Sequence, residues 1–73
     1  MNEKVELSRT QIVELISQWI HNERDRKILL RRMCDGITYE TLSEEFELSV
    51  QQTKRIVYKG KEIIYRHVPK MDW

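Results

Sequence analysis

The stretch from Thr38 to Lys61 constrains the fold of this chain most, because it carries two helix-start signals close together. Thr38 is suited to cap a helix, and the apolar side chains of Leu42 and Phe46, four positions apart, would then share one face of that helix. Ser49 is suited to cap a second helix a few residues later. The stretch therefore predicts a short helix, a tight turn and a longer second helix.

The predicted second helix has two different sides. Its apolar stripe is formed by Thr53, Ile56, Val57, Gly60 and Ile64. Its other side carries the polar or basic residues Gln51, Gln52, Lys54, Arg55, Tyr58 and Lys59. A short acidic helix followed by a turn and by a basic, amide-rich helix is typical of a helix-turn-helix. We therefore expect this helix to bury its stripe and to present its basic side outward.

Charge is unevenly distributed along the chain, although the net charge is only +1. Every charged residue in 35–48 is acidic, and every charged residue in 49–61 is basic. A second basic cluster, diluted by acidic residues, lies in 24–32. A basic helix face is often no more than a solvated surface, but its position behind a cap and a turn favours a nucleic-acid interface.

The rest of the chain also indicates helices. Ser8 or Thr10 can cap a first helix that runs to about residue 20 or 21, and Asn22 can cap a second helix that stops at Gly36. Two glycines and one proline leave little room for loops, and alternating β-branched runs are nearly absent. These features predict an all-α fold.

The length of 73 residues suits one small domain. We expect a four-helix domain with an N-terminal helix in 8–21 and a C-terminal helix-turn-helix part in 22–68. Trp19 continues the apolar face of the first helix, which predicts a core or interface anchor. Gly60 lies inside the last helix, where it indicates either the close approach of another helix or local flexibility.

The sequence shows no motif for catalysis or for a cofactor. Cys34 is the only cysteine, so an internal disulfide is excluded, and His21 and His67 lack the spacing of metal ligands. No glycine-rich phosphate loop is present. No apolar run approaches the length of a membrane span, and no secretory leader is evident. We therefore expect a cytoplasmic protein that is not an enzyme and that needs no cofactor, metal or membrane.

Several motifs follow one another in the residues from Arg24 to Pro69. The segment RDRKILLRR, with its paired arginines and an apolar run, precedes a glycine-containing link, the segment TYETLSEEF and a Leu-Ser turn into the second helix. In this order and spacing the chain resembles region four of bacterial sigma-70 family factors, the helix-turn-helix that reads the minus-35 promoter element. The 73 residues leave no room for the sigma-factor region that grips core polymerase and melts the minus-10 element. The resemblance therefore implies a stand-alone regulator, like the small ones of bacterial phages and mobile elements.

The resemblance also implies which residues contact double-stranded DNA. The positions that read base edges in the major groove correspond to Val50, Gln51, Lys54 and Arg55. The positions that bind backbone phosphates correspond to Arg24, Arg32, Thr38, Tyr39, Ser49, Gln52, Tyr58 and Lys59. The amide of Gln51 suits adenine, whereas Arg55 or Lys54 suits guanine.

Other functions stay open beside transcription regulation. One is a protein-interaction module that docks on RNA polymerase or another factor; its motivation is a surplus of apolar residues, namely Trp19, Ile20, Tyr65 and Trp73. Another is DNA packaging or recombination in a phage, with the same DNA chemistry but a different target. A homodimer is also open, because one small domain buries only about 600–1,000 Å² on DNA.

Overall fold

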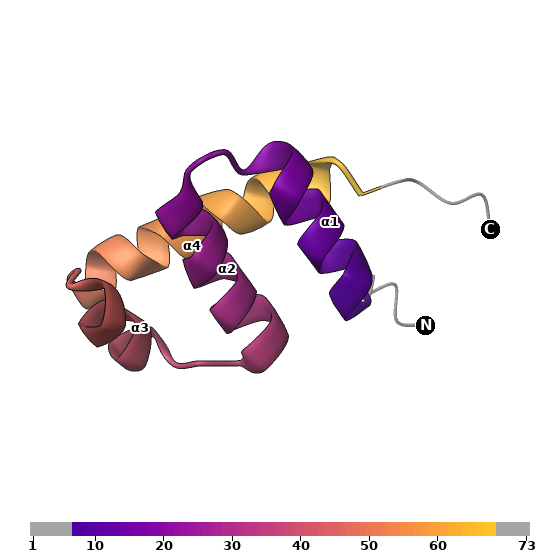
Figure 1. The fold of residues 1–73 in the computed structure, drawn as a ribbon. Helices are drawn as coiled ribbons and strands as arrows, with labels where there is room; N and C mark the ends of the chain where they lie inside the picture. The colour runs from indigo at the N-terminus through magenta and orange to yellow at the C-terminus, as the bar shows by residue number, and fades with distance from the viewer. Residues whose placement is uncertain (1–6, 69–73) are drawn as a thin grey trace, which may run out of the picture.

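The computed structural model describes residues 7–68, and within them the chain forms four α-helices and no strand. Figure 1 shows α1 (Arg9–Trp19), α2 (Glu23–Asp35), α3 (Tyr39–Phe46) and α4 (Val50–Arg66). The prediction of an all-α fold with four helices is confirmed. Trp73, one of the apolar residues considered for docking, lies outside the described residues.

Each helix begins after a residue whose side chain accepts a hydrogen bond from the backbone of the first turn. These N-caps are Ser8, Asn22, Thr38 and Ser49. Such caps satisfy N–H groups that have no partner inside the helix. At the end of α2, Gly36 adopts the left-handed conformation with φ 69°. The predicted start of every helix and the predicted stop of α2 are therefore confirmed, and Ser8 rather than Thr10 caps α1.

The last helix and α2 each pack against all three other helices. In Figure 1, α1 and α2 lie side by side and antiparallel, and both cross α4. The short α3 packs against α2 and against α4. Within residues 7–68, α1 and α3 do not touch each other, whereas α4 contacts all three other helices.

The core is made of aliphatic side chains from all four helices and from the α1–α2 corner. Its buried members are Ile12, Leu15, Ile16, Ile20, Ile28, Leu29, Leu42, Val57 and Ile64. From α4 the core also receives Thr53, which is fully buried and donates its hydroxyl proton to the carbonyl oxygen of Ser49 at 2.9 Å. The hydroxyl is therefore satisfied where an unpaired polar group would be costly. This packing buries one side of α4 and leaves its opposite side exposed.

Trp19 is not a core residue, so the core alternative predicted for it is wrong, whereas the interface alternative stays a prediction. The side chain is 41% exposed. Its ring stacks on the ring of His67 at the end of α4, with the centroids 3.6 Å apart and the planes 11° from parallel. The imidazole Nδ1 of His67 also lies 2.9 Å from the carbonyl oxygen of Ile63. Trp19 therefore joins α1 to α4 at the surface.

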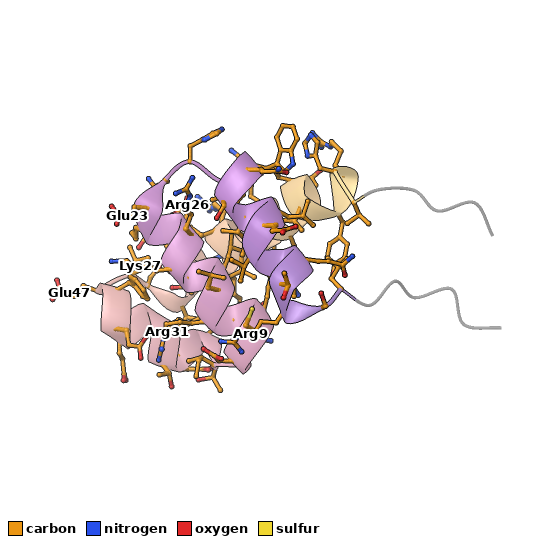
Figure 2. The ribbon with its side chains drawn as sticks, turned by 45° about the vertical axis from the view of Figure 1, so that its right-hand side comes forward. Arg9, Glu23, Arg26, Lys27, Arg31 and Glu47 are labelled. Carbon is orange, nitrogen blue, oxygen red and sulfur yellow. The ribbon has the colours of Figure 1, made fainter. Side chains whose placement is uncertain are left out.

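Arg26 fastens α2 to the C-terminal end of α1. Its Nη2 donates to the carbonyl oxygen of Ser17 at 2.8 Å, and its Nε donates to the carbonyl oxygen of Ile20. The last carbonyl groups of a helix lack partners and carry the negative end of its dipole, so a guanidinium suits them. Figure 2 shows Arg26 on α2 near the α1–α2 corner. This contact fixes the geometry of the corner.

Gly60 of α4 lies directly against Leu29 of α2. A Cβ atom built at Gly60 would lie 2.5 Å from Cδ1 of Leu29 and 3.0 Å from its Cγ. Leu29 is fully buried and has little room to move aside. The close-approach interpretation of this glycine is therefore confirmed.

We expect the substitution Gly60→Ala to lower the free energy of unfolding by about 1 kcal/mol. Overpacking a core costs about 1–3 kcal/mol, whereas replacing a helical glycine by alanine gains at most about 1 kcal/mol. Urea unfolding followed by circular dichroism measures the difference. Lys61→Ala places an alanine at the next helical position and should change stability by less than about 0.5 kcal/mol. A stabilised Gly60→Ala variant would contradict the close approach.

Glu47 closes α3 in a conformation that favours glycine. Its φ is 56° and its ψ is 47°, which is the left-handed region. The following N–H group, that of Leu48, donates to the carbonyl oxygen of Ser43 at 2.9 Å. This bond completes the helix end and turns the chain sharply toward Ser49. A residue with a Cβ in this region costs about 1–2 kcal/mol, so the turn is strained.

Glu47→Gly is expected to raise the free energy of unfolding by about 1 kcal/mol, because it removes the Cβ and with it the strain. The gain is partly offset by the greater freedom of glycine in the unfolded chain. Glu47→Gln removes the charge but keeps the Cβ, and should leave stability nearly unchanged. Equal gains in both variants would assign the effect to charge and not to the backbone. Chemical unfolding of the two variants in parallel gives the answer.

Candidate functional site

The exposed side of α4 carries a row of polar and basic side chains. Exposed residues line a shallow depression along it; they are Gln51, Lys54, Arg55, Tyr58, Lys59 and Glu62. The depression has a volume of about 540 Å³. On the other side of α4, Thr53, Val57, Gly60 and Ile64 are buried. The predicted division of this helix into a buried stripe and an outward basic face is confirmed, with Ile56 half-buried at the border.

The three cations on this face form no ion pair with a carboxylate among residues 7–68. Within residues 7–68 the ion pairs are Arg9–Asp35, Arg24–Asp25, Arg31–Glu45 and Arg66–Glu62. The tightest is that of Arg31, whose Nε and Nη2 donate to the two carboxylate oxygens of Glu45 at 2.7 and 2.6 Å. Lys54, Arg55 and Lys59 take part in none of these pairs. Their charges are therefore available to an anionic partner.

Much of the outer surface of α2, by contrast, has mixed charge. Figure 2 shows Glu23, Lys27 and Arg31 along α2 and Arg9 near its far end. Arg31 is held by Glu45 of α3, and the guanidinium of Arg9 lies 3.4 Å from the carboxylate of Asp35. The basic cluster in 24–32 is therefore partly neutralised, and the α4 face is the stronger candidate for binding an anion.

Tyr39 stands at the centre of a cluster that joins three helices. The guanidinium carbon of Arg32 lies 4.4 Å from the centre of its ring, and Nζ of Lys54 lies 5.8 Å from it. The ring of Tyr58 meets it edge-on, with the centroids 6.1 Å apart. Such contacts between cations and rings are favourable and restrict the side chains. The structure thus brings together four of the residues expected to contact DNA.

Two predicted phosphate ligands next to the turn also cap α4. The N–H group of Gln52 donates to Oγ of Ser49 at 3.0 Å, and the N–H group of Ser49 donates to Oε1 of Gln52 at 3.0 Å. In this reciprocal pair each side chain acts only as an acceptor, through its oxygen, for a backbone N–H group. The hydroxyl proton of Ser49 and the side-chain N–H groups of Gln52 remain as donors for a phosphate.

Thr38 is engaged in a similar way at the start of α3. Its Oγ1 accepts from the N–H group of Thr41 at 3.2 Å and donates to Oγ1 of Thr41 at 2.9 Å. The exposed hydroxyl of Thr41 is therefore the better outward donor. The sequence interpretation omitted Thr41, although its place three residues after a threonine cap is the position to which such a cap bonds.

Neither of the two arginines predicted to bind phosphate lines the depression on α4. Arg32 is half-buried, and its Nη1 donates to the carbonyl oxygen of Ile37 at 2.9 Å, so it holds the α2–α3 link. Arg24 is exposed in the first turn of α2 and pairs with Asp25 at 3.2 Å. Val50, predicted to reach a base, is half-buried at the first position of α4. The roles of these residues stay predictions.

No three His, Cys, Asp or Glu side chains in 7–68 gather as a metal ion would require. None of the helices in that range has the length and apolar content needed to cross a membrane.

Comparisons with protein-family models, curated protein sequences and solved structures give no match to this chain.

Removing the ring of Tyr39 is expected to loosen the cluster. Tyr39→Leu should lower the free energy of unfolding by about 1 kcal/mol, because both cation contacts and the edge contact with Tyr58 are lost. Tyr39→Phe keeps the ring and should lose less than about 0.5 kcal/mol. Urea unfolding measures both variants. If Phe and Leu are equally destabilising, the hydroxyl and not the ring carries the interaction.

Proposed function

We propose that this chain binds double-stranded DNA in a sequence-specific way through α4 and acts as a transcription regulator similar to sigma-70 region four. The observation that carries the proposal is the exposed side of α4. There Lys54, Arg55 and Lys59 lie beside exposed amides without a carboxylate partner among the described residues. Unneutralised cations on one helix face are the electrostatic footprint of a nucleic-acid-binding surface.

The dimensions of α4 suit the major groove. The helix has 17 residues and is therefore about 25 Å long, and the major groove of about 12 Å width admits one α-helix. In this proposal α3, the link 47–49 and α4 form the helix-turn-helix, and the N-terminal half of α4 enters the groove. Figure 1 shows α3 lying beside that half of α4.

Side-chain chemistry then assigns the contacts. Gln51 offers an amide for the N6 and N7 edge of adenine, and Arg55 offers a fork of donors for the O6 and N7 edge of guanine. Lys54 also suits guanine, and Tyr39 restricts the positions open to its ammonium group. Lys59 and the outward donors of Gln52 and Ser49 are suited to phosphates, which set the register of the helix on the duplex.

The docking alternative retains little of its motivation. Ile20 is buried in the core, and one face of the Trp19 ring is covered by His67. Of the apolar residues considered for docking within 7–68, Tyr65 is the most exposed, at 47%. An isolated exposed aromatic residue is common on protein surfaces. DNA binding is therefore the function that the geometry supports best.

The double substitution Lys54→Ala and Arg55→Ala is expected to weaken binding roughly 100-fold, or by about 3 kcal/mol, through lost contacts to bases and phosphates. The slope of log affinity against log salt concentration should also fall by about one to two. The probe is the duplex that the unaltered chain selects from a random pool. Fluorescence anisotropy over a range of salt concentrations gives both quantities.

The matched control is the double substitution Arg9→Ala and Arg66→Ala, which removes the same charge from two exposed arginines that already have carboxylate partners. Its affinity should fall much less. An unchanged affinity and salt slope for the Lys54 and Arg55 variant would refute the proposed interface. An equal loss in both variants would show that only net charge matters.

A further inference from the structure

A second concave surface lies between α4 and the corner where α1 turns into α2. It is a groove of about 370 Å³. Trp19 and Ile20 line its α1 side, and the half-buried Ile56 and Ile63 line its α4 side. Gly60 also lines the groove, and because it has no side chain it adds no bulk there. The lining is therefore mainly apolar.

The charged lining of this groove comes from both of its sides. Arg55 and Lys59 contribute cations from α4, and neither forms an ion pair within the described part of the chain. The carboxylate on the opposite side, that of Asp25, is already paired with Arg24 at 3.2 Å. An anionic group at the α4 side would therefore meet two free cations, and the opposing carboxylate is largely compensated.

The groove and the α4 face share two residues. Arg55 and Lys59 line the apolar groove on one side and the shallow depression of the proposed DNA-binding face on the other. A ligand whose charge pairs with these two side chains makes them unavailable to the phosphates and bases of DNA. Since coupling between two ligands is reciprocal, DNA would in turn weaken the binding of that ligand.

We propose that the groove binds a small organic anion with an apolar body, and that its occupancy lowers the affinity of α4 for DNA. The volume lies within the range of about 300–1,000 Å³ found for small-molecule sites, which combine apolar walls with a few polar groups. The apolar body packs against Trp19, Ile56 and Ile63. The charged end, a carboxylate or a sulfonate, pairs with Lys59 and Arg55. The effect on DNA affinity rests on the proposed function, whereas binding of the anion in the groove does not.

The test of the site uses the intact chain without DNA and the fluorescent dye anilinonaphthalene sulfonate, an apolar anion that brightens in apolar surroundings. We expect saturable binding to one site. The neutral dye N-phenylnaphthylamine, which has the same aromatic frame without the sulfonate, should bind at least about tenfold more weakly, since a charge-assisted contact is lost. Equal binding of both dyes would overturn the role of the cations.

Variants locate the site. Lys59→Gln should weaken binding of the sulfonate dye about tenfold, and Trp19→Ala should weaken both dyes. Lys61→Gln makes the same charge change two residues away at a position outside the groove, and should leave dye binding unchanged. Circular dichroism verifies that each variant is folded. If neither Lys59→Gln nor Trp19→Ala alters binding, the dye binds elsewhere and the site is refuted.

Competition with DNA tests the coupling. In the unaltered chain, a saturating concentration of the sulfonate dye should reduce affinity for the selected duplex by at least fivefold, within the usual range of coupling between sites. The neutral dye should not. Dye binding without any loss of DNA affinity would overturn the coupling and leave the site intact. If the Lys54 and Arg55 variant binds DNA normally, the proposed function fails, and the dye titration without DNA still decides whether the groove is a site.

Discussion

The contact between Leu29 of α2 and the backbone of α4 at Gly60 is the constraint on which the rest of the structure depends. A glycine there lets the two helices approach closely, so that a fully buried leucine fills the space that a Cβ would occupy. With α2 in that position, Val57 and Ile64 are buried as well. Because α4 is apolar on one side only, burying that side leaves its basic face exposed.

In addition to this packing, local side-chain interactions determine the positions of several exposed side chains. Tyr39 lies between Arg32 and Lys54 and meets Tyr58 edge-on, so three helices meet at one ring. Arg26 holds the corner of α1 and α2 through two carbonyl groups. Side chains expected to contact DNA, such as Arg32 and Lys54, thus also take part in holding the helices together.

The features predictable from sequence were those that depend on a few neighbouring residues. Caps such as Thr38 and Ser49 bond to the backbone three residues later, so the sequence predicts them. The buried stripe of α4 follows from helical periodicity. Both predictions are confirmed. The stacking of Trp19 on His67 joins opposite ends of the chain, and no local pattern predicts it. The same holds for the cluster at Tyr39 and for the groove beside Lys59, which exist only once the helices are packed. The base and phosphate contacts remain predictions, because they depend on a partner.

The order of the helices along the chain has a consequence for synthesis. Since α1 and α3 do not touch within residues 7–68 and each relies on α4, the apolar faces of the first three helices have no complete partner while the last one is still inside the ribosome. A chain built in this way gains little from folding piece by piece. It should instead acquire its structure in a single cooperative event after residue 64 has emerged, when Ile64 can complete the core.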